Sequence, residues 1–383
     1  WVIKPTGEIE FRRSNPESSH TSLEELIADA NPSMMDGGRG QTQDVPFQPG
    51  DWVRLNDDAP GYDPWEVVTV DFAAQKLTLR QRSFAEGVII TRSFTDATKE
   101  QSSRAKKPHL TELHELLIAP ISDLLPTNPQ APVVFVPQQE LFLVPFPALQ
   151  DREGKYLIEK HTILTTPAIR VLQSTYQRRH QLSGEAQAQQ VLVVGNPNPM
   201  PEGFKPLPYS ENEAVDIARL LNTTPLIGKD ATEPAIERQL SNARLIHLAT
   251  HGQFDDRVPL KGAIALAPAG EKYDGLLTAE EIMQYRLNAE LVVLSACNTG
   301  RGQITGDGVI GLTRTLIAAG VPSVIVSLWS VPDESTTTLM IEFYRNYVQN
   351  PDKAQALRQA MLTTMESFPD PENWAAFTLV GSP

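Results

Sequence analysis

The sequence predicts an α/β protein whose core is a mainly parallel sheet with helices on both faces. From residue 133 onward, short apolar runs alternate with helical segments, the order that produces parallel strands. One such run, VLVVGNP at 191–197, is almost entirely apolar, as expected of a strand buried on both faces. Hydrophobic residues make up 40% of the 383 positions, which is enough apolar surface for a sizeable core.

The region before residue 133 has a different character. Residues 1–11 predict a strand pair, and 21–30 and 110–125 predict helices. Between them, residues 45–98 contain short aromatic and β-branched runs separated by Asp, Gly and Pro. This pattern predicts a small antiparallel, barrel-like β insertion.

The α/β region supplies strands and helices in turn. Its apolar runs predict strands at 191–197, 244–252, 289–297, 321–331 and 374–381. Its helical segments are 209–222, 232–243, 277–287, 308–320, 334–349 and 353–367. Thr278 and Glu281 have the spacing of a capping box, and Gly320 is suited to end a helix. A Gln/Ala-rich link follows at 181–190, before the strand at 191–197.

Charge and cysteine content exclude several classes of protein. The formal net charge is −14, which argues against nucleic-acid binding and against docking on anionic lipid. One cysteine cannot form an internal disulfide, so we expect a reducing, cytoplasmic compartment. No apolar run reaches the roughly 18 residues of a membrane helix. The chain begins at Trp1 with a strand-like segment and no signal peptide, so we expect it to be the C-terminal part of something longer.

Two predicted strands end in residues that could carry out catalysis. His251 closes one and Cys297, the single cysteine, closes another. Ligands bind at the carboxyl ends of parallel strands, and neighbouring strands run about 4.8 Å apart. A histidine at that distance would lower the pKa of the thiol and protonate the leaving amine. The amides of Gly252 and Cys297 are the natural donors to an oxyanion.

Other interpretations of the same residues remain open. A lone cysteine is more often inert core than nucleophile. His247 and His251 would lie about 13 Å apart on a strand, so we expect no metal and no cofactor, and we interpret His247 as a core histidine. Asp255 and Asp256 follow the base closely enough to orient it, although a solvated loop is the usual role.

A glycine pattern offers a third interpretation. Gly306, Gly308 and Gly311 spell G-x-G-x-x-G before a predicted helix. A dinucleotide loop must follow its strand directly, whereas this pattern begins nine residues after Cys297. We therefore favour flexible backbone that shapes a substrate cleft over a nucleotide loop.

Four motifs carry a resemblance to a known family. The sequence resembles the CHAT family in HLATHG, LSACNTG, GDGVIGLTRTLIAAG and SVIVSLWSVPD, with similarity from about residue 110 to the end. These are caspase-like cysteine peptidases, related to separases, that are usually found after tetratricopeptide repeats in cyanobacteria and filamentous bacteria. The resemblance implies a caspase-like fold with His251 as base, Cys297 as nucleophile and the Gly252 and Cys297 amides as oxyanion hole. It also implies an N-terminal pseudo-protease half at 1–180 and an active C-terminal half at 190–383.

The resemblance extends to substrate recognition. Separases carry a Trp-Asp-Val-x-Asp stretch whose last acid recognises arginine, and the matching stretch here is WSVPD, ending in Asp333. Ser330 replaces the first acid of that motif, and Asp333 is also placed to cap the helix that starts near Glu334. Ser295, two residues before the cysteine, is a second candidate for the substrate pocket.

The sequence therefore supports two functional hypotheses. The first is a cysteine endopeptidase that forms a thioester, cleaves proteins after a basic residue and is regulated by N-terminal repeats or a protein partner. The second is a catalytically silent caspase-like scaffold that works by binding.

Overall fold

The computed structural model describes the residues of two units. The described residues are 1–14, 22–30, 52–55, 65–71, 74–81, 88–99, 108–184, 190–253, 262–270, 272–295, 303–305, 308–329 and 332–383. One unit comprises Trp1–Met35 with Lys106–Pro383, and the other comprises Asp36–Ala105.

The smaller unit is a five-stranded antiparallel sheet in the order β6-β5-β4-β3-β7. Its strands are β3 (Trp52–Leu55), β4 (Trp65–Asp71), β5 (Lys76–Gln81), β6 (Val88–Ser93) and β7 (Ala97–Lys99). A small cluster forms its core: Val53, Leu55, Trp65, Val67, Leu77 and Leu79. An antiparallel sheet thus stands where the aromatic and β-branched runs predict one.

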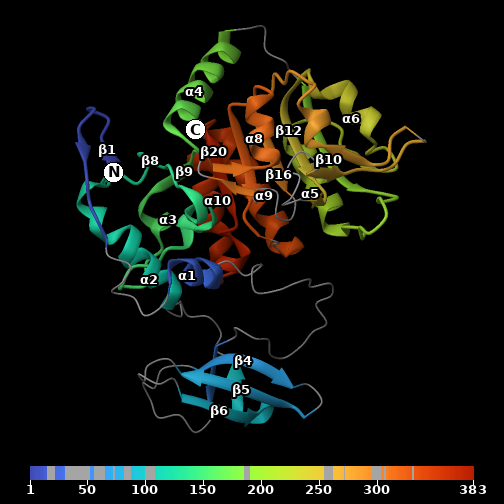
Figure 1. The fold of residues 1–383 in the computed structure, drawn as a ribbon. Coiled ribbons are helices and arrows are strands. Elements are labelled where there is room, and N and C mark those ends of the chain that lie inside the picture. The colour runs from blue at the N-terminus through green and yellow to red at the C-terminus, as the bar shows by residue number, and fades with distance from the viewer. Residues whose placement is uncertain are drawn as a thin grey trace. The chain divides into compact units, whose positions relative to one another are not determined.

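The larger unit is organised around an eight-stranded sheet in the order β11-β10-β12-β16-β19-β20-β9-β8 (Figure 1). The strands are β8 (Pro132–Phe135), β9 (Thr162–Thr165), β10 (Gln190–Pro197), β11 (Leu226–Gly228), β12 (Ala243–Ala249), β16 (Leu291–Ser295), β19 (Ser323–Ser327) and β20 (Phe377–Gly381). Six of the seven neighbouring pairs are parallel. The predicted α/β class with a mainly parallel sheet is confirmed.

The helices divide between the two faces of this sheet. They are α1 (Leu23–Ala30), α2 (Pro108–Leu117), α3 (Leu157–Lys160), α4 (Ile169–Gly184), α5 (Pro208–Leu220), α6 (Glu233–Leu240), α7 (Ala279–Ile282), α8 (Leu312–Ala318), α9 (Asp333–Gln349) and α10 (Lys353–Ser367). Helices α5, α9 and α10 share one buried cluster with Leu291 and Val293, and α6, α7 and α8 share another with Val292 and Leu294. Alternate residues of one strand thus face opposite helical layers, which explains the continuous apolar runs.

One strand pair departs from the parallel pattern. β20 is antiparallel to β19 and parallel to β9. A single crossover helix carries the chain from the carboxyl end of one strand back to the end of the sheet where the next parallel strand begins. Two successive helices, α9 and α10, lie between β19 and β20. The second helix brings the chain back to the end of the sheet where β19 finishes, so β20 runs antiparallel to β19.

The glycine-rich segment after β16 also differs from prediction. Gly308–Ile310 is a short strand, β18, which pairs with β17 (Gln303–Thr305), whereas the sequence predicts a helix from Gly308. Helix α8 begins only at Leu312, because glycine and β-branched residues disfavour helix. Gly320 follows the helix at φ +109°, as predicted for a C-terminal glycine.

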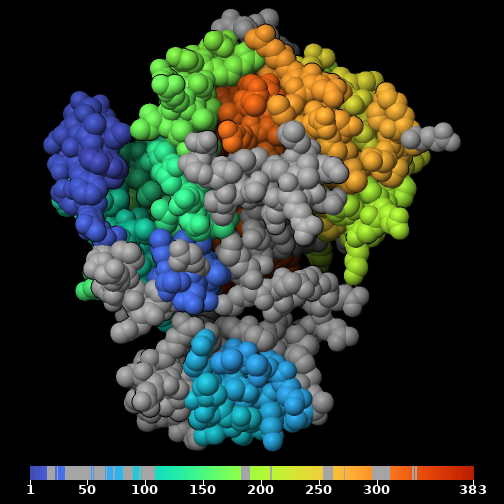
Figure 2. Space-filling model, viewed as in Figure 1, coloured from blue at the N-terminus to red at the C-terminus, as the bar shows by residue number. Residues whose placement is uncertain are grey.

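The N-terminal residues of the larger unit form a short strand pair. The strands β1 (Val2–Ile3) and β2 (Ile9–Glu10) pair in the segment drawn in blue on the surface in Figure 2. Trp1 and Ile9 are exposed at 82% and 61%. β8 and β9, which precede residue 181, lie in the same sheet as the strands after residue 190. The division of the chain into a pseudo-protease half and an active half stays a prediction.

No described helix is long and apolar enough to cross a membrane.

Candidate active site at the carboxyl ends of β12 and β16

The two strands that the sequence singles out are neighbours in the sheet. β12 and β16 are parallel and in register, with Ala249 opposite Ser295 at their carboxyl ends. His251 lies two residues after Ala249. Cys297 comes two residues after Ser295 in the sequence and lies outside the described residues. The predicted adjacency of the two strands is therefore confirmed, and the position of the thiol stays a prediction.

His251 has a defined hydrogen bond. Its Nε2 lies 2.7 Å from the backbone carbonyl oxygen of Lys205, in the loop between β10 and α5. A carbonyl oxygen only accepts, so Nε2 carries the proton and donates it. In the neutral imidazole, Nδ1 then holds the lone pair and is the basic atom of the ring.

An aromatic side chain from the same loop also contacts the histidine. The ring of Phe204 lies 5.4 Å from the ring of His251, tilted by 39°. Neither Phe204 nor Lys205 is marked by the sequence as a site residue. A backbone carbonyl carries no residue-type signal because every residue has one, so this partner of His251 could not be found from sequence.

Gly252 begins the short strand β13 (Gly252–Gln253) directly after the histidine. β13 pairs with β14 (Ala263–Ala265), with Gly252 opposite Ile264. The amide of Ala265 donates to the carbonyl of His251 at 2.9 Å. This bond makes Gly252 and Ile264 a non-hydrogen-bonded pair, so the pairing with β14 does not consume the Gly252 amide.

His247 has a structural environment. It is fully buried, with Nε2 2.8 Å from Oε1 of Glu213 on α5 and Nδ1 3.2 Å from the hydroxyl of Tyr344 on α9. Burial raises the pKa of Tyr344 well above its usual value, so its hydroxyl stays protonated and donates to Nδ1. The interpretation of His247 as a core histidine is confirmed.

The remaining predicted residues are placed only in part. Ser295 is buried, and its hydroxyl has no hydrogen-bond partner among the described residues. Asp333 is the first residue of α9, and Pro332 occupies the N-cap position; the Asp333 side chain lies outside the described part. Asp255 and Asp256 also lie outside it.

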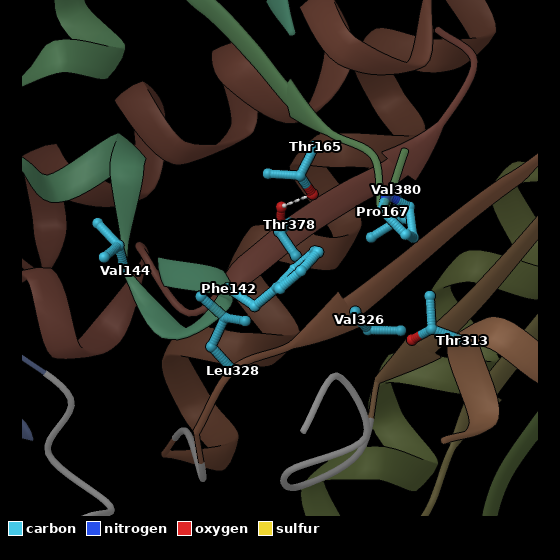
Figure 3. Close-up of a pocket in the computed structure, with 9 residues that line it drawn as sticks. All are labelled: Phe142, Val144, Thr165, Pro167, Thr313, Val326, Leu328, Thr378 and Val380. Atoms are coloured by element: carbon cyan, nitrogen blue, oxygen red, sulfur yellow. Dashed lines mark hydrogen bonds between the residues drawn. The ribbon is translucent and has the colours of Figure 1, made fainter. Parts of the chain in front are cut away.

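A pocket opens on the sheet face that carries α8 (Figure 3). Nine residues line it: Phe142, Val144, Thr165, Pro167, Thr313, Val326, Leu328, Thr378 and Val380. Thr165 and Thr378 are joined by a hydrogen bond of 3.1 Å. Of the predicted site residues that the structure describes, none is among those that line this pocket. No group of three or more His, Cys, Asp or Glu in the described ranges could hold a metal ion.

The fold and the position of His251 define a mixed α/β protein with a candidate site at the carboxyl ends of the parallel strands β12 and β16. A model of the CHAT domain matches residues 107–382. The chain therefore belongs to the CHAT family, as its four motifs predict.

Curated relatives and solved structures place this family match in context. Tetratricopeptide repeat protein 28 of mouse is 29% identical over 348 residues and that of human 30% over 353. Each match covers 78% of this chain but only 14% of the relative. The Arg specific cysteine proteinase gingipain R is similar over 74% of this chain and 68% of its own, with 13% identity and a TM-score of 0.48. The Saccharomyces cerevisiae separase–securin complex is similar over 74% and 18%, with 17% identity and a TM-score of 0.46.

Proposed function

We propose that this chain is a cysteine endopeptidase in which His251 is the general base and Cys297 the nucleophile. The observation that carries the proposal is the hydrogen bond from Nε2 of His251 to the Lys205 carbonyl, at the end of the strand next to β16. This bond leaves Nδ1 as the proton acceptor. Cys297 is as far past Ser295 in sequence as His251 is past Ala249, which supports the pairing of thiol and imidazole.

The proposed reaction has two stages. Nδ1 of His251 takes the thiol proton, and Sγ of Cys297 attacks the carbonyl carbon of the scissile peptide, whose π electrons move to the oxygen. When this intermediate collapses, the C–N bond breaks, the amine leaves with the proton from Nδ1, and a thioester remains. Water then attacks the thioester, giving one proton to Nδ1. The C–S bond breaks, and the proton returns to the thiolate.

Backbone amides would stabilise the oxyanion in both stages. The Gly252 amide is not used in the pairing with β14, which supports its role as one donor. We assign the other donor to the amide of Cys297. A single preorganised donor of this kind contributes about 10²- to 10³-fold in kcat.

Specificity and regulation form the finer part of the proposal. Asp333 would select a basic residue before the scissile bond, since a carboxylate pairs with Arg or Lys, and Ser295 would line the same pocket. Tetratricopeptide-type repeats in the full-length protein, or a protein partner, would regulate the enzyme. The relatives named for such repeats support this arrangement. We also propose a cytoplasmic location, an N-terminal pseudo-protease half at 1–180 and an active half at 190–383.

A fluorogenic peptide library tests the activity, with Cys297→Ala and His251→Gln as the inactive controls. We expect cleavage by the unmodified protein only, with Arg or Lys before the cleaved bond. A profile dominated by apolar residues at that position would overturn the role of Asp333.

A second measurement is needed if no peptide is cleaved. A peptide electrophile should then label Cys297 rapidly in a latent peptidase, because only an ionised thiol in a formed cleft reacts quickly. Slow labelling, equal to that of an unfolded control, would reject the peptidase in favour of the scaffold.

A further inference from the structure

The loop between β10 and α5 supplies both contacts that the structure gives to the His251 ring, the Lys205 carbonyl and the Phe204 ring. A loop carbonyl selects one histidine tautomer only if the loop itself is held in place. Near its start, the loop is anchored where the amide of Asn198 donates to the carbonyl of Gly228 at 3.0 Å. The other end is anchored by a side chain from β10.

Asn196 is that side chain. It is buried, and its backbone has a φ of +41°, a left-handed conformation that asparagine tolerates better than most residues. Its Oδ1 accepts a hydrogen bond from the amide of Leu207 at 2.9 Å. Its Nδ2 donates to Oε2 of Glu211 at 3.0 Å, which fixes the orientation of the side-chain amide.

Ser210 completes the anchor. Its hydroxyl donates to the carbonyl of Leu207 at 2.7 Å and accepts from the amide of Asn196 at 3.0 Å. Leu207 occupies the N-cap position of α5, where its own side chain offers no acceptor. Both backbone groups of Leu207 are therefore held by side chains of its neighbours, and Lys205 is only two residues away.

We infer that Asn196 is a positioning residue that keeps the Lys205 carbonyl aimed at Nε2 of His251. By doing so it keeps the proton on Nε2 and the basic lone pair on Nδ1. The effect on catalysis rests on the proposed peptidase function, but the effect on the tautomer does not. A purely structural role, in which Asn196 only supports the start of α5, would leave the tautomer unchanged.

The experiment compares Asn196→Gly with the double variant Asn196→Asp/Glu211→Gln. Glycine removes the side chain and adopts a positive φ without strain, so it isolates the lost hydrogen bonds. In the double variant, aspartate keeps the oxygen that accepts from Leu207, and the amide introduced at position 211 donates to its second oxygen in place of the Asn196–Glu211 bond. The matched control is Asp352→Ala, which removes a side chain that accepts from an N-terminal amide of α10, that of Gln355.

The main readout is ¹⁵N NMR of histidine-labelled protein, with the His251 signals assigned by His251→Gln. We expect the unmodified protein, Asn196→Asp/Glu211→Gln and Asp352→Ala to show a single Nε2–H tautomer at His251. In Asn196→Gly, the signals should move to the average of two tautomers. An Nε2–H tautomer retained in Asn196→Gly would overturn the inference.

Peptide cleavage is the second readout. We expect kcat of Asn196→Gly to fall about tenfold, because a shifted general base transfers protons less efficiently. Asp352→Ala should keep the original kcat. If the unmodified protein cleaves nothing, electrophile labelling of Cys297 decides the proposed function, and the tautomer measurement still decides the role of Asn196.

A milder variant covers the case in which Asn196→Gly does not fold. Ser210→Ala removes one hydroxyl that bonds both Asn196 and Leu207. It should give a partial tautomer shift in the same direction, and an unchanged tautomer would count against the inference.

Discussion

His247 and His251 lie four residues apart along one stretch of chain and have opposite environments. His247 is fully buried between α5 and α9, with side-chain partners for both ring nitrogens. His251 lies just beyond the strand, with a carbonyl at Nε2 and an aromatic ring beside it. Both ring nitrogens of His247 are thus hydrogen-bonded in the core, whereas Nε2 of His251 is hydrogen-bonded just beyond the carboxyl end of β12.

The difference shows how position along a buried strand determines what a histidine can do. In the interior, each ring nitrogen must find a partner because an unpaired polar atom is costly there. Beyond the carboxyl end of β12, one ring nitrogen can remain available as a base. The comparison therefore predicts that losing His251 impairs chemistry and that losing His247 impairs stability.

The largest expected effect is on activity. His251→Gln should lower kcat/KM for the best peptide substrate by about 10³-fold, the range expected for loss of a general base. Its free energy of unfolding should stay within about 0.5 kcal/mol of the original value. His180→Gln, the same substitution at an exposed histidine of α4, is the control and should leave both quantities unchanged. Equal activity in both variants would break the comparison.

The next effect is on stability. His247→Ala should lower the free energy of unfolding, measured in urea, by about 3–5 kcal/mol, because Glu213 is left buried without its partner. Adding Glu213→Gln should restore part of the loss, since a neutral amide is less costly to bury than an unpaired carboxylate. An additive loss in the double variant would show that the two side chains are not coupled.

A buried lysine sharpens the comparison between the buried and the edge position of an ionisable side chain. Lys353 is almost fully buried, its Nζ donates to the carbonyl of Pro383, and burial lowers its pKa to about 8 from 10.5. Between about pH 8 and 10.5 the folded state binds fewer protons at this residue than the unfolded state, so stability rises with pH. The stability of the unmodified protein relative to Lys353→Met should rise by up to roughly 3 kcal/mol across this window. A constant difference would contradict the lowered pKa.

The smallest effect concerns the second partner of His247. Tyr344→Phe removes the hydroxyl at Nδ1 but keeps the ring that packs against His247 and Phe343. We expect a loss of about 1 kcal/mol, the usual contribution of one hydrogen bond, with no change in peptide cleavage. A loss as large as that of His247→Ala would mean that the Tyr344 hydroxyl, and not the Glu213 carboxylate, is the main partner of the histidine.

Much of the fold could be predicted because local patterns matched the final structure. The apolar runs at 191–197 and 244–252 are buried on both faces, and Thr278 and Glu281 form the expected capping box. The direction of β20 could not be read from its own residues, because it depends on how the two preceding helices pack. The sequence predicts a helix at Gly308–Ile310, where the structure has a strand, because these residues adjoin a true helical pattern.

The candidate site could be predicted only where it depends on residue type. The position of His251 at the carboxyl end of its strand could be predicted, because the apolar run before it identifies both the strand and where the strand ends. The carbonyl of Lys205, the Asn196 anchor and the Glu213 partner of His247 depend on loop and helix placement. Asparagine and glutamate in those positions are indistinguishable in sequence from ordinary surface residues.

The direction and pairing of β20 have a consequence for synthesis of the chain. β8 and β9 join the rest of the sheet only through β20, and Thr165 pairs with Val380. During translation, at about 5–20 residues per second, strands β10 to β19 can assemble as each helix follows its strand. Of the strands in this sheet, β8 and β9 emerge first from the ribosome, but they can join it only after Phe377–Gly381 is made, more than 200 residues later. The earliest-made strands of the sheet are therefore among the last to pair.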